Sequence, residues 1–164
     1  MTKPTATETA PVITFTQGLP GSGKSTTLRR LGYTANATTI DPDAFKAQHP
    51  EYDPKNPGPL HAWSKQQAEA MFQSALTGGT GDWIVDGTGT NAEKIARRID
   101  QAKAAGFRTR LVYVRVAVET AIARNASRAR TVPQSLIEEK ALDITTAHAI
   151  CAPMAHEVVV VDND

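Results

Sequence analysis

The stretch Gly18-Leu19-Pro20-Gly21-Ser22-Gly23-Lys24-Ser25 decides the fold of this chain of 164 residues. It fits the pattern G-x-x-x-x-G-K-[ST] in full, which is the pattern of a phosphate-binding loop, or P-loop. The run 12–17 directly before it alternates Val or Ile with Thr and Phe, which predicts a short strand. The segment after the loop predicts a helix that ends near Gly32. A strand, a glycine loop and a helix in this order are the context that the pattern requires.

The composition of this loop suits a polyphosphate ligand. Glycines let successive backbone N–H groups turn toward phosphate oxygens, and the start of a helix adds the positive end of its dipole. We expect Lys24 to reach the β- and γ-phosphates of ATP and the Ser25 hydroxyl to ligate Mg²⁺. An ordinary glycine turn with an exposed lysine would leave two of the glycines unexplained. The expected nucleotide-binding residues in this stretch are Gly18, Pro20, Gly21, Ser22, Gly23, Lys24, Ser25 and Thr26.

Outward from the loop, short apolar strands alternate with helical segments along the rest of the chain. Such alternation implies right-handed crossovers and a parallel sheet, with ligands at the carboxyl ends of the strands. The expected fold class is therefore α/β, a three-layer P-loop NTPase fold with about five parallel strands and helices on both faces. The expected strands are 12–17, 38–40, 83–85, 108–116 and 158–161, and the expected helices after the first are 43–48, 60–76, 91–105, 118–129 and 133–151.

Composition narrows the class of protein. The content of 40% hydrophobic and 21% charged residues is ordinary for one soluble domain, which we place at 12–164 after a disordered tail at 1–11. No apolar run is long enough to span a membrane and no signal peptide is evident, so we expect a cytoplasmic protein. Cys151 is the only cysteine, which excludes an intrachain disulfide, and we expect it to be buried in a helix. Asp162 and Asp164 are expected to be frayed terminal residues.

The formal net charge of +1 hides a strong asymmetry along the chain. Residues 91–131 carry ten Lys and Arg against three acidic residues, while the remainder carries eight against fourteen. A basic region of this size favours a polyphosphate ligand or a phosphorylated acceptor. Solvated helix faces explain any single one of these charges equally well.

Asp41 and Asp43 follow directly after the second expected strand, at the edge of the sheet where a γ-phosphate would point. A kinase needs a carboxylate within reach of the acceptor hydroxyl to orient it and to accept its proton. Either aspartate suits that role. Asp41 also suits a turn or the N-cap of a helix that begins at Pro42, and the spacing alone does not decide between these roles.

Four motifs in this order resemble the zeta-toxin family of P-loop kinases, within the group that includes polynucleotide kinases. They are GLPGSGKST (18–26), DPDAFKAQHPEY (41–52), IVDGTGT (84–90) and RNASRARTVP (124–133), and together they span most of the chain. The second motif is the most distinctive of the four. The resemblance implies that Asp43 is the general base, with Asp41, Lys46 and His49 in the acceptor pocket.

The third and fourth motifs carry further roles by resemblance. IVDGTGT is similar to the family's acceptor-binding segment, which makes Asp86 and Thr88 acceptor-binding candidates. Asp86 is equally suited to orient the Mg²⁺ shell, as an Asp after an apolar strand does in many P-loop proteins. The fourth motif resembles a short lid whose arginines stabilise charge on the transferred phosphoryl group, which implies Arg124 and Arg130. By the same resemblance, Asn163 lies where related kinases place a loop near the adenine.

The sequence also departs from the family. Lys46 replaces the usual Arg, Asp86 is one methylene shorter than the expected Glu, and the chain is short at the lid. The leading hypothesis is an ATP-dependent kinase of a small phosphorylated or nucleotide-linked sugar, as zeta toxins are for UDP-N-acetylglucosamine. The alternatives are a kinase of nucleic-acid hydroxyls, served by the basic region, and an ATP-binding interaction module without turnover. An antitoxin partner is not indicated by the sequence, and neither is a membrane.

Overall fold

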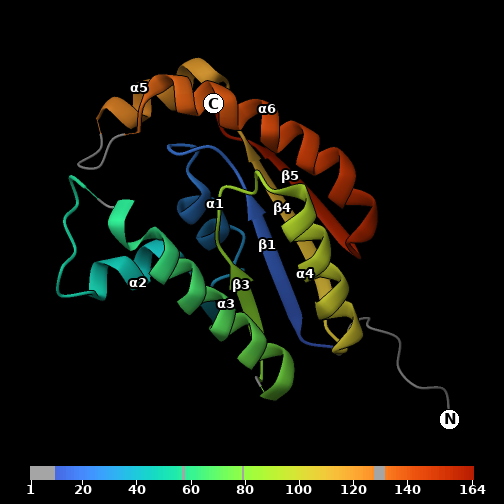
Figure 1. Ribbon diagram of the computed structural model, residues 1–164. Coiled ribbons are helices and arrows are strands. Elements are labelled where there is room, and N and C mark those ends of the chain that lie inside the picture. The colour runs from blue at the N-terminus through green and yellow to red at the C-terminus, as the bar shows by residue number, and fades with distance from the viewer. Residues whose placement is uncertain (1–9, 57, 79, 128–131) are drawn as a thin grey trace, which may run out of the picture.

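The computed structural model describes residues 10–56, 58–78, 80–127 and 132–164. In this part of the chain five strands form one parallel sheet in the order β2-β3-β1-β4-β5 (Figure 1). The expected five-stranded parallel sheet is therefore confirmed. The strands are β1 (Val12–Gln17), β2 (Ala37–Ile40), β3 (Asp82–Val85), β4 (Arg108–Arg115) and β5 (Glu157–Asp162). The α-helices are α1 (Lys24–Arg30), α2 (Pro42–Gln48), α3 (His61–Gly78), α4 (Ala92–Ala104), α5 (Val118–Ala126) and α6 (Gln134–Cys151), with 3₁₀ turns η1 (Gly58–Leu60) and η2 (Ala152–Met154).

Helices cover both faces of the sheet, which makes the three layers that the sequence predicts. One face packs against α3, α4 and α6, where Phe72 and Ile99 meet Phe15 of the central strand β1. The other face packs against α1 through Leu28, beside Val112 of β4. Helix α5 lies with α6 over the end of the sheet, as Figure 1 shows. Burial of these apolar side chains on both faces is the main favourable contribution to the stability of the fold.

The carboxyl ends of β1, β2 and β3 meet at one edge of the sheet. The backbone N–H of Gly18 donates to the Thr88 carbonyl at 3.0 Å, and the N–H of Asp86 donates to the Ile40 carbonyl at 2.9 Å. These bonds hold the loops after the three strands side by side. Three motifs that are distant in the sequence therefore come together at this edge.

Strand β5 closes the sheet as an edge strand. Its side chains alternate between half-buried and exposed, with Val158 39% and Val160 45% exposed. The expectation that Asp162 and Asp164 are frayed is wrong. Asp162 pairs with Arg115 of β4 at 2.7 Å, and Asp164 accepts a hydrogen bond from the Ala117 N–H. The parallel pairing with β4 supplies these partners, and local sequence gives no sign of them.

The ends of the elements differ slightly from the expected ones. Helix α2 begins at Pro42 because Asp41 caps it, and proline fits the first position of a helix. Helix α5 ends at Ala126, and residues 128–131 of the expected lid lie outside the described residues. So does most of the expected tail, although the Pro11 carbonyl already accepts a bond from the Arg108 N–H. Cys151 is fully buried at the end of α6, as expected. Within the described ranges, no helix has the length and apolar character needed to cross a membrane.

Candidate active site

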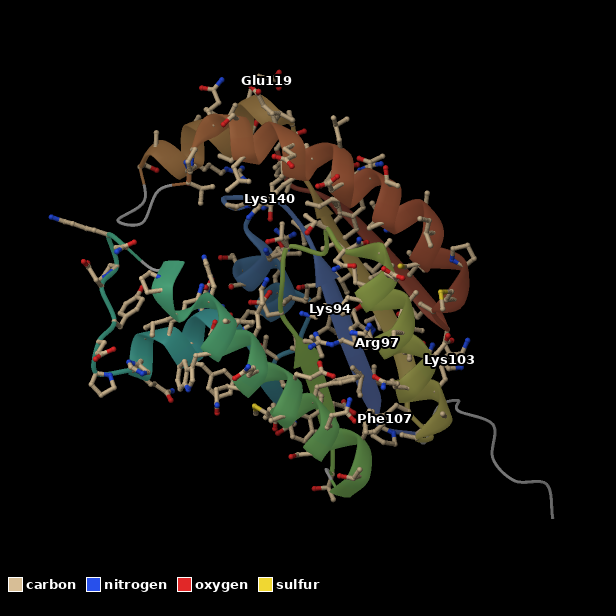
Figure 2. The ribbon with its side chains drawn as sticks, viewed as in Figure 1. Lys94, Arg97, Lys103, Phe107, Glu119 and Lys140 are labelled. Carbon is tan, nitrogen blue, oxygen red and sulfur yellow. The ribbon has the colours of Figure 1, made fainter. Side chains whose placement is uncertain are left out.

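A cleft of about 870 Å³ opens at the edge where the three strands end. Its walls come from the P-loop, from the start of α2 and α3, and from the segment 85–91 that leads into α4. Arg124 of α5 and Lys140 of α6 close one side, and Lys140 lies below α6 next to the P-loop in Figure 2. The sequence motifs thus line a single concave space of the size that small-molecule ligands occupy.

The backbone of the P-loop depends on glycine at two positions. Gly21 and Gly23 have φ angles of 83° and 84°, in the left-handed region that residues with a side chain rarely adopt. A Cβ atom at Gly23 would overlap the side-chain nitrogen of Asn163, and one at Gly21 would lie 3.1 Å from the Ala121 carbonyl. The loop therefore needs glycine both for its shape and for its close contact with α5 and the C-terminal segment.

The inner side of this loop has hydrogen-bond donors to spare. Among the described residues, the N–H groups of Gly21, Gly23 and Ser25 find no acceptor. The Ser22 hydroxyl is buried and also lacks a partner in this part of the chain. A buried polar group without a partner is costly, and phosphate oxygens are acceptors that satisfy such donors. The residues present therefore fit a bound polyphosphate.

The outer side of the loop is held by side chains from two distant segments. The guanidinium of Arg124 donates to the Gly21 and Ser22 carbonyls at 3.3 and 3.4 Å and to the Asn163 carbonyl at 2.8 Å. The Asn163 side chain donates to the Ser22 carbonyl at 2.7 Å. Together Arg124 and Asn163 form what we call the P-loop clamp. The clamp ties the Gly21 and Ser22 carbonyls of the loop to α5 and to the C-terminal segment.

Lys24 lies at the start of α1, inside the cleft. Its Nζ donates to the Gly18 carbonyl at 3.1 Å, so the side chain folds back over the loop that precedes it. Its charge also lowers the pKa of Asp41, although burial outweighs this effect. Lys24 therefore places a positive charge between the P-loop and the carboxylates on the opposite wall.

Three carboxylates face the cleft from the ends of β2 and β3. Asp41 caps α2 by accepting a bond from the Asp43 N–H at 2.9 Å, which confirms the N-cap role that the sequence left open. Burial first, and then the charge of Asp86, raise the pKa of the Asp41 carboxyl above its ordinary value. Carboxylates that share a partly dry site in this way are typical of sites that bind cations or move protons.

Asp86 is held in place by β1. Its Oδ1 lies 3.0 Å from the Thr16 hydroxyl, which also lies 3.0 Å from the Gly87 carbonyl and accepts a bond from the Gly87 N–H at 2.9 Å. A hydroxyl has one proton, so it donates to one of these two oxygens at a time. Thr16 is thus a site residue that the sequence analysis missed, although its place one residue before the end of the strand is a usable signal.

Asp43 is the most exposed of the three carboxylates and has a buried lysine beside it. Lys46 is 3% exposed, and its Nζ lies 3.4 Å from Asp43 Oδ1 and in close contact with His61 Nδ1. A ring nitrogen that accepts a bond from an ammonium must carry no proton itself. The contact with Lys46 therefore favours neutral His61, and the lysine charge stays directed at Asp43.

The donors in the cleft also fit Mg²⁺. Ser25 and Asp86 both line it, and Mg²⁺ usually takes one or two protein oxygens and completes its shell with water and phosphate oxygens. No three His, Cys, Asp or Glu side chains lie close enough to hold a metal alone anywhere in residues 10–56, 58–78, 80–127 and 132–164. The donor set is thus one for a metal that arrives with a nucleotide.

Most of the expected site residues meet in this cleft. Three of the described ones do not line it. Gly18 lies at the start of the loop, where its N–H donates to the Thr88 carbonyl. His49 ends α2, where its ring packs edge-on against Trp63 at 4.8 Å, and Asn163 belongs to the P-loop clamp. Arg130 lies outside the described residues, and so does Arg128, the third arginine of the fourth motif and a reserve candidate for the same role. The expected residues that do line the cleft are Pro20, Gly21, Ser22, Gly23, Lys24, Ser25, Thr26, Asp41, Asp43, Lys46, Asp86, Thr88 and Arg124.

The sequence analysis missed a group of cationic and polar side chains on the wall opposite the P-loop. Lys65 and Ser64 come from α3, and Lys94 and Arg98 come from α4. A signal for the last two exists, because they are four residues apart on the helix that follows the third motif. No comparable signal identifies Lys65, which comes after the proline-rich loop.

Four of the eight basic side chains that the structure describes in residues 91–131 pair with acidic side chains from outside that stretch. Arg98 pairs with Glu69, Arg110 and Arg108 pair with Glu157, and Arg115 pairs with Asp162. Of these arginines, only Arg98 lines the cleft, and its guanidinium also lies over the Phe72 ring, 5.1 Å from the ring centroid. The charge asymmetry in the sequence therefore overstates the positive surface that is available to a ligand.

The AAA domain family matches residues 13–149, which is most of the chain. A comparison with curated proteins finds no match. Among solved structures, a chain of the PezAT chromosomal toxin–antitoxin system of Streptococcus pneumoniae has a TM-score of 0.75 at 16% identity, over 94% of this chain and 70% of that one.

Two further structures share the fold. The complex AvrRxo1-ORF1:-ORF2 with ATP has a TM-score of 0.67 at 16% identity, over 88% of this chain and 50% of that chain. The Pnkp1/Rnl/Hen1 RNA repair complex has a TM-score of 0.63 at 18% identity, over 87% and 47%. This chain thus spans about half the length of these two. The likeness at these identities shows the fold, and it confirms the expected P-loop kinase-like architecture.

Proposed function

This chain belongs to the AAA domain family, and from its site we propose that it transfers the γ-phosphoryl group of ATP to a hydroxyl group of an acceptor. The observation that carries the proposal is one cleft in which unsatisfied P-loop donors and Lys24 face the carboxylates of Asp41, Asp43 and Asp86. The P-loop side suits a triphosphate. The carboxylate side suits a hydroxyl that must lose a proton.

In the proposed mechanism Asp43 is the general base. Its carboxylate accepts the proton of the acceptor hydroxyl while that oxygen forms a bond to the γ-phosphorus, and the bond from this phosphorus to the bridging oxygen of ADP breaks. The buried Lys46, held by His61, directs its charge at Asp43 and orients the carboxylate. Asp43 suits the role better than Asp41, whose Oδ1 already accepts the α2 capping bond.

The other residues bind and position the reactants. Lys24 and the N–H groups of the P-loop hold the phosphates, and the P-loop clamp keeps those N–H groups aimed into the cleft. Ser25 and Asp86 would hold Mg²⁺, which when bound neutralises charge on the phosphates. Arg130 stays a predicted lid residue. In the described structure Arg124 serves the loop, so its action on the phosphates also stays a prediction.

For the acceptor we propose a small phosphorylated or nucleotide-linked sugar, of the kind that zeta toxins phosphorylate. The resemblance of the second and third motifs supports this acceptor class. Four arginines of 91–131 are already paired with carboxylates, which weighs against a long nucleic-acid surface. A cytoplasmic location remains a prediction.

The test is transfer of label from γ-labelled ATP in the presence of Mg²⁺ to three groups of acceptors: nucleotide sugars with sugar phosphates, nucleosides, and DNA or RNA with 5′-hydroxyl ends. We expect label in the first group. The Asp43→Asn variant should keep ATP binding and lower kcat by roughly 10²–10⁴-fold. Asp100→Asn is the matched control, because Asp100 is exposed on α4 and does not line the cleft.

Three results would refute parts of this proposal. Full transfer by Asp43→Asn would assign the base to another residue. Tight ATP binding without transfer to any acceptor would favour an interaction module without turnover, and label on 5′-hydroxyl ends alone would favour a nucleic-acid kinase.

A further inference from the structure

Two lysines of the cleft have no acidic partner. Lys65 comes from α3 and Lys94 from α4, and Figure 2 shows Lys94 in the space between these two helices. Within the described ranges, neither ammonium makes a hydrogen bond or an ion pair. The neighbouring Arg98 does, because its Nε and NH2 both donate to Glu69 Oε2, at 3.2 and 2.5 Å. The nearest carboxylate is therefore already bound to another cation.

The positive charge at this place is costly in the structure as it stands. Burial, followed by the charges of Arg98 and Lys65, lowers the pKa of Lys94 below its ordinary value, and Glu69 offsets this only in part. Lys94 is half-buried, so it is not a lysine of a solvated helix face. Lys65 is exposed beside it and adds a like charge. A partly buried charge such as that of Lys94, with like charges near it, destabilises a fold unless a bound anion compensates it.

The position of the two lysines relates them to the acceptor side of the cleft. Lys65 follows His61 by four residues, so it lies one turn along the same face of α3, and His61 contacts the Lys46 that faces Asp43. Lys94 lies in the first turn of α4, where the segment that begins with Asp86 ends. The P-loop with Lys24 forms a separate group of phosphate ligands.

We propose that Lys65 and Lys94 form an anion subsite of the cleft that binds a phosphate group carried by the acceptor whose hydroxyl lies at Asp43. The identity of the ligand as a phosphoryl acceptor rests on the proposed kinase function, whereas binding of a phosphate group by the two lysines can be tested without it. It makes these two lysines the residues that select a phosphorylated acceptor over its neutral counterpart. A polynucleotide would require a longer row of available cations than the described residues offer.

The test is a calorimetric titration with the P-loop already saturated by a non-hydrolysable ATP analogue and Mg²⁺. The probes are N-acetylglucosamine, N-acetylglucosamine 1-phosphate and UDP-N-acetylglucosamine. We expect at least one phosphorylated probe to bind tenfold or more tightly than the neutral sugar. Lys65→Gln and Lys94→Gln should each weaken that binding about 3- to 10-fold, and the double variant should bind it no better than the neutral sugar.

The matched control is Arg97→Gln, which removes the same charge from α4 at an exposed position outside the cleft. It should change the affinity less than twofold. Thermal unfolding checks each variant, and the lysine variants should unfold at or above the temperature of the parent chain, because the charges they remove lack partners.

The outcomes separate the two proposals. Lysine-dependent binding of a phosphorylated probe without any phosphoryl transfer refutes the kinase proposal and supports the subsite. Transfer that is indifferent to both lysines and to the phosphate of the acceptor refutes the subsite and leaves the kinase proposal intact. The subsite is also refuted if neither phosphorylated probe binds.

Discussion

Replacement of Arg124 by alanine should loosen the P-loop before it affects chemistry. The change removes the guanidinium that donates to the Asn163 carbonyl at 2.8 Å and to the Gly21 and Ser22 carbonyls at 3.3 and 3.4 Å. A hydrogen bond from a charged donor contributes about 1.5–3 kcal/mol, and the two longer contacts add little. We therefore expect a loss of about 2 kcal/mol of unfolding free energy, or a fall in Tm of roughly 4–8 °C for a chain of this size.

The same change should weaken nucleotide binding. If about 1.4 kcal/mol of that loss falls on the binding conformation of the loop, the Kd for ATP with Mg²⁺ rises about tenfold. Calorimetry gives the Kd, and thermal unfolding with and without nucleotide gives the stability. Arg124→Lys should not restore either quantity, since one ammonium cannot reach carbonyls on two segments as a planar fork does. Asn163→Ala, which removes the other half of the P-loop clamp, should shift both quantities in the same direction by less.

A specific result would refute this reasoning. If Arg124→Ala leaves Tm and Kd unchanged and lowers only kcat, the contacts to the loop are dispensable and the arginine acts on the transferred phosphoryl group. Arg29→Ala is the control, because Arg29 is exposed at the end of α1.

Three further predictions follow from the same geometry. Burial and the charge of Asp86 raise the pKa of Asp41, so the folded state loses stability as pH rises from 3.8 through the folded pKa and this carboxyl becomes charged. Asp41→Asn keeps the cap without the charge and should have an equal or higher Tm at pH 7. Asp41→Ala removes the cap and should lose about 1 kcal/mol of unfolding free energy in chemical denaturation. Gly23→Ala forces a left-handed residue against the C-terminal segment, and it should abolish measurable ATP binding in calorimetry. Burial and the charge of Arg115 lower the pKa of His148 below 6.5, so as pH falls this imidazole is protonated in the unfolded chain before it is protonated in the folded one. Protonation therefore favours unfolding, and Tm should fall as pH drops below about 6.5. His148→Gln should make this fall shallower.

The two residues of the P-loop clamp show what sequence motifs predict about a site and what they do not. Arg124 and Asn163 were both expected near the nucleotide, and both do contact the P-loop. Their contacts are to its outer carbonyls, however, and the expected roles at the phosphates and the adenine stay untested. A motif specifies which residues lie near a loop more reliably than which side of the loop they touch, because that depends on how α5 and the C-terminal segment pack.

The charges show the opposite case, in which the sequence pattern misleads. The basic stretch 91–131 suggests a broad positive surface, but four of its arginines pair with Glu69, Glu157 and Asp162 in other segments. Of the two cleft lysines without an ion pair, Lys94 comes from that stretch and Lys65 comes from α3. No count along the chain separates a paired charge from an available one.

By itself the sequence determined the glycine loop, the alternation of strands and helices, and the carboxylates that end β2 and β3. These are local properties, because a left-handed glycine, an N-cap and a buried strand each depend on a few adjacent residues. Only the tertiary structure decided which carbonyls Arg124 holds, which partner neutralises each arginine, and that Lys65 and Lys94 share one wall. Those contacts join segments far apart in the chain, and packing of α3, α4 and α5 around the sheet selects them.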